Sequence, residues 1–108
     1  MLIVHTTLSD RAAAEAMAQQ LIENRLAACV HIGAPIQAHY RWQGKAETAV
    51  EIPLAIKTSR ARYPALEHYL KAHHSYEVPE IVAVAVVEAL PAYYTWVQCE
   101  CGDAPLSP

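Results

Sequence analysis

Apolar and polar residues change their spacing several times along the chain, and each change marks an expected element. Leu2 to Thr7 begins with three apolar residues in a row and predicts a first strand. Apolar side chains then recur at helical spacing as far as Asn24-Arg25, so we expect a helix that Ser9 or Asp10 caps. Met17 lies on the apolar stripe of this helix, and we therefore interpret it as a core residue.

A pattern of period two follows, with one interruption. Ala28 to Ile32 begins a second strand, and Gly33 to Pro35 predicts a bulge or bend, because glycine and proline suit a strand ladder poorly. The alternation then resumes, turns at Gln43 to Lys45 and returns as far as Thr58. We expect a long amphipathic hairpin with one apolar face. Pro53 cannot donate to a ladder, so we place it at a bulge or an outward-facing edge.

The second half of the chain changes from a helical to an extended pattern. Ser59 to His74 predicts a second helix, which Ser59 caps, and Ser75 to Glu80 is then a loop. From Glu80 to Val87 most residues are β-branched or Ala, which is typical of a strand covered on both faces. Pro91 begins a short last helix.

The order of elements is therefore strand, helix, strand, strand, helix, strand, helix. With right-handed crossovers, the first six form a β-α-β-β-α-β unit, so we expect an α+β ferredoxin-like sandwich with helices on one face of an antiparallel sheet. The short C-terminal helix follows this unit. A chain of 108 residues is expected to form one domain. We assign residues 1–101 to it and residues 102–108 to a C-terminal tail.

The hairpin between the second and third strands is too long for such a domain. Ala28 to Gln43 would reach roughly 50 Å if straight, whereas a chain of this length has a diameter of roughly 35 Å. The tip should therefore overhang, with Tyr40 and Trp42 on an exposed apolar face. An exposed ribbon of this kind is a liability unless another subunit covers it, so we expect an oligomer.

Charge and composition exclude two classes of partner. Eight Lys and Arg residues stand against eleven Asp and Glu residues, a formal charge of −3, and no basic cluster could follow a phosphate backbone. We therefore expect no nucleic-acid partner. No apolar run approaches the roughly 20 residues that span a bilayer, and no signal peptide precedes the first strand, so we expect no membrane contact and a cytoplasmic location. Three cysteines, an odd number, fit a reducing compartment.

The chain lacks the usual catalytic signatures. It has no Gly-rich phosphate loop, no nucleophile elbow and no His-Glu-x-x-His motif, so we do not expect an enzyme. Six histidines and three cysteines instead suggest a metal such as copper or zinc, because imidazole and thiolate suit these ions.

The spacing of these residues leaves the metal hypothesis open. His73 and His74 are neighbours about 100° apart around a helix, so they cannot converge on one ion unless the helix unwinds. Cys29 lies in a strand, where a cysteine is more often a small hydrophobe than a ligand. Cys99 and Cys101 near the C-terminus could chelate copper or could have no role. A copper site at Cys29 would need a second ligand, for which His73 or His74 is the candidate.

Lys57 ends an otherwise apolar strand and could reach Glu77 and Glu80 in the loop between the second helix and the last strand. A buried lysine is rare unless it is paired. Such a cluster could bind a small anion, gate a metal or be a structural ion pair, and the commonness of ion pairs without function favours the last. Tyr76 in the same loop is either a site residue or a packed anchor whose hydroxyl group is hydrogen-bonded.

Five motifs carry a resemblance that covers nearly the whole chain. They are Leu26-Ala27-Ala28-Cys29-Val30, Tyr40-Arg41-Trp42-Gln43-Gly44-Lys45, Ile56-Lys57-Thr58, His74-Ser75-Tyr76-Glu77-Val78-Pro79-Glu80-Ile81 and Tyr93-Tyr94-Thr95-Trp96. In this order and spacing they resemble the CutA divalent-cation-tolerance family. The resemblance implies a ferredoxin-like subunit, a homotrimer formed through the long hairpins, tolerance of copper and other divalent cations, and a shape similar to the PII signalling proteins. It implies no established reaction.

The resemblance also implies which residues form a site. We expect ligand-binding residues at Trp42, Lys57, Tyr76, Glu77 and Glu80, beside Pro79, and metal-binding residues at Cys29, His73 and His74. The chain departs from the usual family pattern at Pro53, Ser75, Ala85, Ala89 and Tyr94. Of these, Ser75 in place of proline loosens the loop that carries Tyr76.

Two hypotheses of different classes follow. The first is a trimeric, non-enzymatic protein of the metal-ion response that binds copper or another divalent cation weakly. The second is a PII-like regulatory protein that binds a small anionic ligand at Lys57, in clefts between subunits. Metal binding should depend on thiol and imidazole groups, whereas anion binding should depend on Lys57 and weaken with salt.

Overall fold

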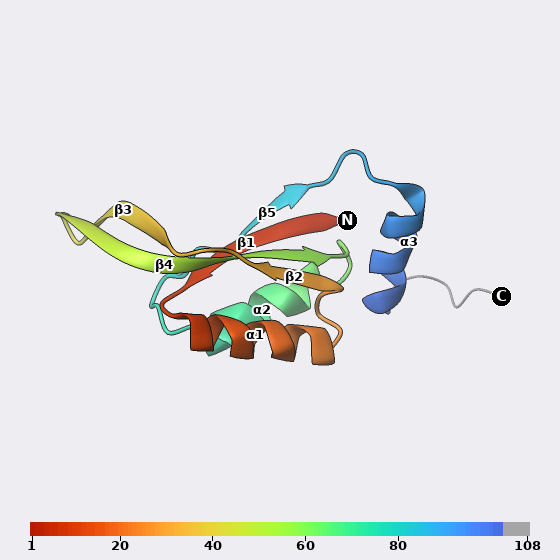
Figure 1. Ribbon diagram of the computed structural model, residues 1–108, viewed down its shortest axis with the longest axis horizontal. Helices are drawn as coiled ribbons and strands as arrows, with labels where there is room; N and C mark the ends of the chain where they lie inside the picture. The colour runs from red at the N-terminus through yellow and green to blue at the C-terminus, as the bar shows by residue number, and fades with distance from the viewer. Residues whose placement is uncertain (103–108) are drawn as a thin grey trace.

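Five strands and three helices occur in residues 1–102, the part of the chain that the computed structural model describes (Figure 1). They are β1 (Leu2–Leu8), α1 (Arg11–Glu23), β2 (Cys29–Ile32), β3 (Ile36–Trp42), β4 (Lys45–Thr58), α2 (Tyr63–His73), β5 (Val82–Ala85) and α3 (Pro91–Glu100). The predicted order is confirmed, with the second strand divided into β2 and β3. The fold is the expected α+β ferredoxin-like arrangement.

The strands form an antiparallel sheet in the order β2-β4-β1-β5, and β3 pairs with the far half of β4. α1 and α2 lie side by side on one face of this sheet (Figure 1). Leu54 and Ile56 of β4 and Leu21, Leu66 and Leu70 of the helices are almost fully buried between them. The hydrophobic core lies between this helix-covered face of the sheet and the two helices.

The other face of the sheet carries neither α1 nor α2. The strand register places two rows of side chains there, which we call the open face: Cys29, Lys57, Ile3 and Val84 in one row, and His31, Ala55, His5 and Val82 in the other. In β1 and β4 these residues alternate with the buried residues of the core. α3 lies beyond one end of the sheet (Figure 1).

The last strand differs from its prediction. β5 covers only Val82–Ala85 and is an edge strand whose single neighbour is β1. Val82 is 49% exposed and Val84 is 55% exposed, so the prediction of a strand covered on both faces is wrong for the single chain. Within residues 1–102, no second layer covers the strand.

α1 begins where one of the two predicted caps is placed. The Asp10 carboxylate accepts a hydrogen bond from the Ala13 backbone N–H at 2.8 Å, which satisfies a donor of the first turn. At the other end Arg25, directly after the last turn, adopts the left-handed conformation with φ of 56°. Met17 is buried in the core, as predicted.

α2 begins at Tyr63, later than predicted. The Ser59 hydroxyl accepts a hydrogen bond from the Arg62 backbone N–H at 3.1 Å, so Ser59 stabilises the turn that precedes the helix. No helix within residues 1–102 is both long enough and apolar enough to cross a membrane.

The interruption between β2 and β3 faces the proline of β4. Gly33 N–H donates to the Pro53 carbonyl at 2.9 Å, and a Cβ atom on Gly33 would lie 2.9 Å from Pro53 Cγ. Because N–H and C=O of one strand residue point the same way, the missing N–H of Pro53 also faces this bend. The predicted position of Pro53 at an irregularity is confirmed, although β4 is an interior strand.

The hairpin turns through two residues, Gln43 and Gly44, both with positive φ (50° and 79°). Trp42 therefore pairs with Lys45, and this register places Tyr40 opposite Glu47. Apolar side chains of β3 consequently face one side of the ribbon, while those of β4, such as Val50, face the other. The prediction of a single apolar face is wrong, because it assumed a longer turn. The overhang is confirmed, since the molecule is 55 Å long and the hairpin projects beyond the helices (Figure 1).

The C-terminal part of α3 is packed against the domain. Cys101 is fully buried beside the Thr58 hydroxyl group, 3.7 Å from its Sγ atom. Arg62 Nε donates to the Cys101 carbonyl at 2.8 Å. The end of α3 is therefore held against the domain by Cys101. Of the predicted tail, residues 103–108 lie outside the described residues.

Candidate functional site

The structure distributes the predicted site residues over four places. Cys29 and Lys57 lie on the open face, at the end of the sheet near α3. Tyr76 lies in the loop between α2 and β5, and His73 lies at the end of α2 on the helical side. Trp42 lies at the hairpin tip and is 40% exposed. No single cluster within one chain contains all of them.

Lys57 has a different partner from the one that its position in the sequence suggested. Its ammonium nitrogen lies 3.2 Å from His31 Nδ1, on the neighbouring strand. The loop that carries Glu77 and Glu80 instead contacts the far end of β1, where His74 bonds to Thr7. Within one chain the structure does not bring Lys57 to these carboxylates.

Cys29 lies directly opposite Lys57 in the register and also contacts α3. Its thiol is hydrogen-bonded to the Tyr93 hydroxyl group. Burial raises the pKa of Tyr93, and the neighbouring Cys29 raises it further. The Tyr93 ring lies 5.6 Å from the Trp96 ring, measured between centroids, so these two aromatic side chains of α3 contact each other next to Cys29.

Sequence reasoning missed His31 and Tyr93 as members of this cluster. His31 follows Cys29 by two positions, so the two side chains share a strand face, a signal that the sequence does contain. Nothing local to Tyr93 indicates its contact with Cys29, because the contact depends on where α3 docks.

His74 uses both ring nitrogens to hold the loop. Its Nε2 lies 2.7 Å from the Thr7 carbonyl oxygen, and its Nδ1 accepts a hydrogen bond from the Tyr76 backbone N–H at 3.1 Å. The first contact requires a proton on Nε2, because a carbonyl can only accept. A metal ion at His74 would therefore have to break one of these contacts.

Tyr76 anchors the loop to the base of the hairpin. Its hydroxyl group is hydrogen-bonded to Glu51 of β4. Burial raises the pKa of Tyr76, and the Glu51 carboxylate raises it further, because a negative neighbour disfavours the phenolate. This contact favours the anchor interpretation of Tyr76.

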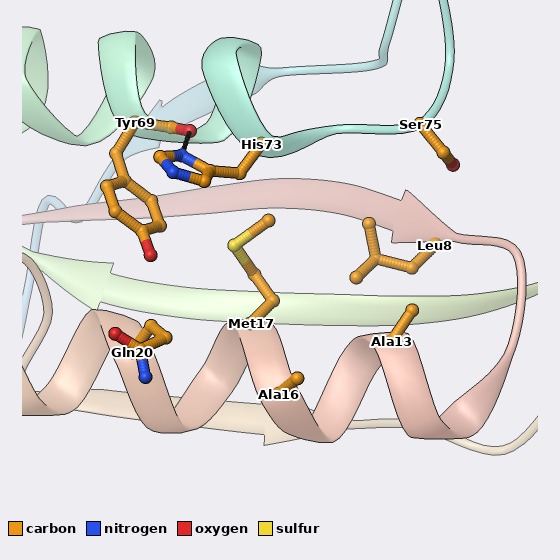
Figure 2. Close-up of a pocket in the computed structure, with 8 residues that line it drawn as sticks. All are labelled: Leu8, Ala13, Ala16, Met17, Gln20, Tyr69, His73 and Ser75. Atoms are coloured by element: carbon orange, nitrogen blue, oxygen red, sulfur yellow. Dashed lines mark hydrogen bonds between the residues drawn. The ribbon is translucent and has the colours of Figure 1, made fainter.

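His73 lies in a groove between α1 and α2 of about 300 Å³, away from the open face. The groove is lined by Leu8, Ala13, Ala16, Met17, Gln20, Tyr69, His73 and Ser75. Figure 2 shows the His73 ring beside the Tyr69 ring, with Nδ1 at 3.0 Å from the Tyr69 carbonyl oxygen. His73 and His74 therefore have separate surroundings, and neither lies beside Cys29 in the same chain.

The loop carboxylates are exposed to solvent. Glu77 lines a second cavity, of about 420 Å³, together with Glu67, Lys71, Val78, Pro79 and Ile81. Glu80, which lies between Pro79 and Ile81 in the sequence, is also exposed. This cavity and the open-face cluster are distinct.

A complete metal site is not preformed in residues 1–102. No group of three or more His, Cys, Asp or Glu side chains in this part of the chain is arranged to hold an ion. Cys99 is exposed while Cys101 is buried, so the two thiols do not form the chelate that the sequence suggested.

Comparisons with known proteins agree on one family. The family model described as "CutA1 divalent ion tolerance protein" matches residues 2–100. The divalent-cation tolerance protein CutA of Thermus thermophilus is 38% identical over 100 residues, which cover 93% of this chain and 97% of that protein. A chloroplastic CutA 1 protein of Oryza sativa is 35% identical over 97 residues, 90% of this chain, and this chain spans only 55% of its length.

A solved structure shows the same fold. The crystal structure of CutA from Xylella fastidiosa superimposes with a TM-score of 0.90 at 41% identity, covering 93% of this chain and 96% of that one. On sequence and structure alike, the chain belongs to the CutA divalent-ion tolerance family.

Proposed function

We propose that this protein is a homotrimeric divalent-cation-tolerance protein that acts in the response to metal ions and binds copper or another divalent cation weakly. Its membership of the CutA family carries this proposal. It acts by binding and not by catalysis. We place it in the cytoplasm, because three free cysteines suit a reducing compartment.

Exposed apolar surface supports the assembly. Tyr40 and Trp42 on one side of the hairpin are 46% and 40% exposed, and Val50 on the other side is 66% exposed. Both sides of the ribbon therefore need a cover, as does the edge strand β5 with its exposed valines. If the ribbon inserts between two neighbouring copies, these copies cover both of its sides, and the edge strand β5 can be covered in the same assembly.

Assembly is measured by light scattering behind a sizing column. The expected mass is three times the 11.9 kDa of one chain. Trp42→Ala together with Tyr40→Ala should dissociate the trimer and leave the subunit folded, because large apolar truncations in a buried patch cost about 3–5 kcal/mol. Ile22→Ala on the exposed side of α1 is the matched control. A wild-type monomer would contradict the proposal.

Cys29 is our proposed thiolate ligand of the metal. Cu(I) prefers thiolate, and a thiol held in a strand binds with a smaller ordering cost than a mobile one. Its further ligands, His73 or His74, come from another copy, because within one chain they lie on the other side of the sheet or are engaged with backbone groups. The ammonium group of Lys57 opposite Cys29 keeps the affinity for a cation low.

The metal proposal is tested by copper titration under reducing conditions. Cys29→Ser and the His73→Gln/His74→Gln pair should each weaken binding, whereas Cys99→Ser should not. Equal binding by all variants would exclude these residues as ligands. Loss of binding in Cys99→Ser alone would indicate an incidental site at the exposed thiol.

A second candidate function is supported by the position of Lys57. No carboxylate among residues 1–102 forms an ion pair with it, and its contact is with a histidine. This favours a PII-like regulatory role in which Lys57 binds a small anionic ligand in a cleft between subunits, near Trp42, Tyr76, Glu77 and Glu80 of neighbouring copies. Anion binding would weaken with salt and persist in a chelator, unlike metal binding.

A further inference from the structure

The open face carries positive and ionisable basic groups but no carboxylate. Its eight residues include Lys57, His5 and His31, in a chain whose formal charge is −3. The nearest acidic residue on the same side of β4 is Glu51, and its carboxylate is hydrogen-bonded to the Tyr76 hydroxyl group at the base of the hairpin. Within residues 1–102, the ammonium group of Lys57 therefore lacks a counter-charge.

The contact between Lys57 and His31 determines which ring nitrogen carries the proton. A lysine ammonium group can only donate, so His31 Nδ1, at 3.2 Å, accepts. The neutral ring then carries its proton on Nε2. The pair presents only donors to an incoming ligand: the remaining N–H groups of Lys57 and the Nε2–H group of His31.

α3 borders this pair on one side. The Tyr93 hydroxyl group is hydrogen-bonded to the thiol of Cys29, which lies directly opposite Lys57 in the register. The Tyr93 phenol is neutral at ordinary pH, since its pKa is raised, and it does not repel an anion. The side chain of Lys57 is half-buried, which holds its charge in place and reduces the screening by water.

We propose that Lys57 and His31 form a subsite for a small dianionic oxyanion, such as a phosphate or dicarboxylate group. Lysine acts as a point charge without the planar fork of arginine, so the net charge of the ligand matters more than its shape. This inference rests on the second candidate function and names its ligand chemistry. It does not require that the protein bind metal.

The test is a calorimetric titration of the full chain with inorganic phosphate and, separately, with succinate, in a chelator at constant ionic strength. Lys57→Met should weaken binding about tenfold or more, because a charge-assisted hydrogen bond is lost. His31→Leu should weaken it less. His68→Leu, at an exposed position of α2, is a matched control that should bind as the wild type does.

The outcomes separate the sources of the anion. Binding of phosphate alone assigns the subsite to phosphate groups, and binding of succinate alone assigns it to carboxylates. Equal affinity in wild type and Lys57→Met, or no binding of either anion, would overturn the inference. If Lys57→Met does not fold, Lys57→Arg should retain binding and His31→Leu should still weaken it.

Two further measurements keep this inference distinct from the first proposed function. Light scattering shows whether Lys57→Met still assembles. Dissociation of this variant, without anion binding by the wild type, would mean that Lys57 pairs with a carboxylate of a neighbouring copy, and it would overturn the inference. Copper binding that survives in the absence of anion binding would overturn only the anion subsite.

Discussion

The two faces of the sheet contrast sharply, although they are built from the same strands. On the helix-covered face, Val4 and Ile56 are fully buried and Leu54 is nearly so. On the open face, Val82 and Val84 remain about half exposed although they are just as apolar. The overhanging hairpin continues this exposed surface.

The contrast teaches that two different processes use the apolar residues of this chain. Residues of the helix-covered face are buried by the chain itself, so they contribute to the stability of the subunit. Residues of the open face and the hairpin gain that stabilisation only when another molecule covers them. Substitutions on the two faces should therefore affect different measurements.

The largest expected effect is a truncation of the core. Leu54→Ala should lower the free energy of unfolding by about 2–5 kcal/mol, because it removes buried surface and leaves a cavity. Val84→Ala on the open face should change it by much less in the isolated subunit. Urea denaturation below the concentration at which the subunits assemble provides the measurement. Equal losses for the two variants would abolish the contrast.

A smaller effect is expected at the bend between β2 and β3. Gly33→Ala should destabilise the subunit by about 1–3 kcal/mol, because the new Cβ would lie 2.9 Å from Pro53 Cγ. Adding Pro53→Ala removes that atom and should recover part of the loss. Thermal unfolding of the two variants measures the coupling, and strict additivity of the two effects would contradict the proposed clash.

A gain in stability is expected within the helix-covered face. Thr6 is 1% exposed, and its hydroxyl oxygen has no hydrogen-bond partner in the structure. Thr6→Val keeps the shape and removes the buried polar group, so it should stabilise the subunit by about 1–3 kcal/mol at most. A loss of stability in urea denaturation would show that the hydroxyl group is hydrogen-bonded.

The smallest effect concerns the tyrosines at the edges of the two faces. The pKa values of Tyr63, Tyr76 and Tyr93 are raised, in each case first by burial. A raised pKa means that folding favours the neutral phenol, so this stability is present below pH of about 10 and is lost as pH rises through the folded pKa. In Tyr76→Phe, the free energy of unfolding should fall less steeply with pH above pH of about 10 than in the wild type. An unchanged alkaline profile would contradict this.

Most of the fold could be predicted from residue patterns. The helical spacing around Met17 and the Gly33 to Pro35 interruption each led to the observed element, because local propensity and final environment agree there. The length of the hairpin also predicted the overhang. The register of the hairpin was missed, because one extra residue in the expected turn moves a whole set of side chains to the other face.

The site was predictable only as a set of residues and not as an arrangement. Cys29 and Lys57 meet across two strands, as a strand register can place them. Lys57 and the loop carboxylates do not meet, because the loop attaches through His74 to the opposite end of β1. That attachment depends on how α2 packs, which no local pattern specifies.

By itself, the sequence determined the family, the order of the elements and the presence of more apolar surface than one small subunit can bury. Those properties follow from local periodicity and from motif spacing, which are written along the chain. Only the tertiary structure decided which apolar strands are covered, that His31 and not a carboxylate contacts Lys57, and that Cys101 belongs to the core. The reason is physical: these contacts join residues distant in sequence, and they exist only once the sheet register and the docking of the helices are set.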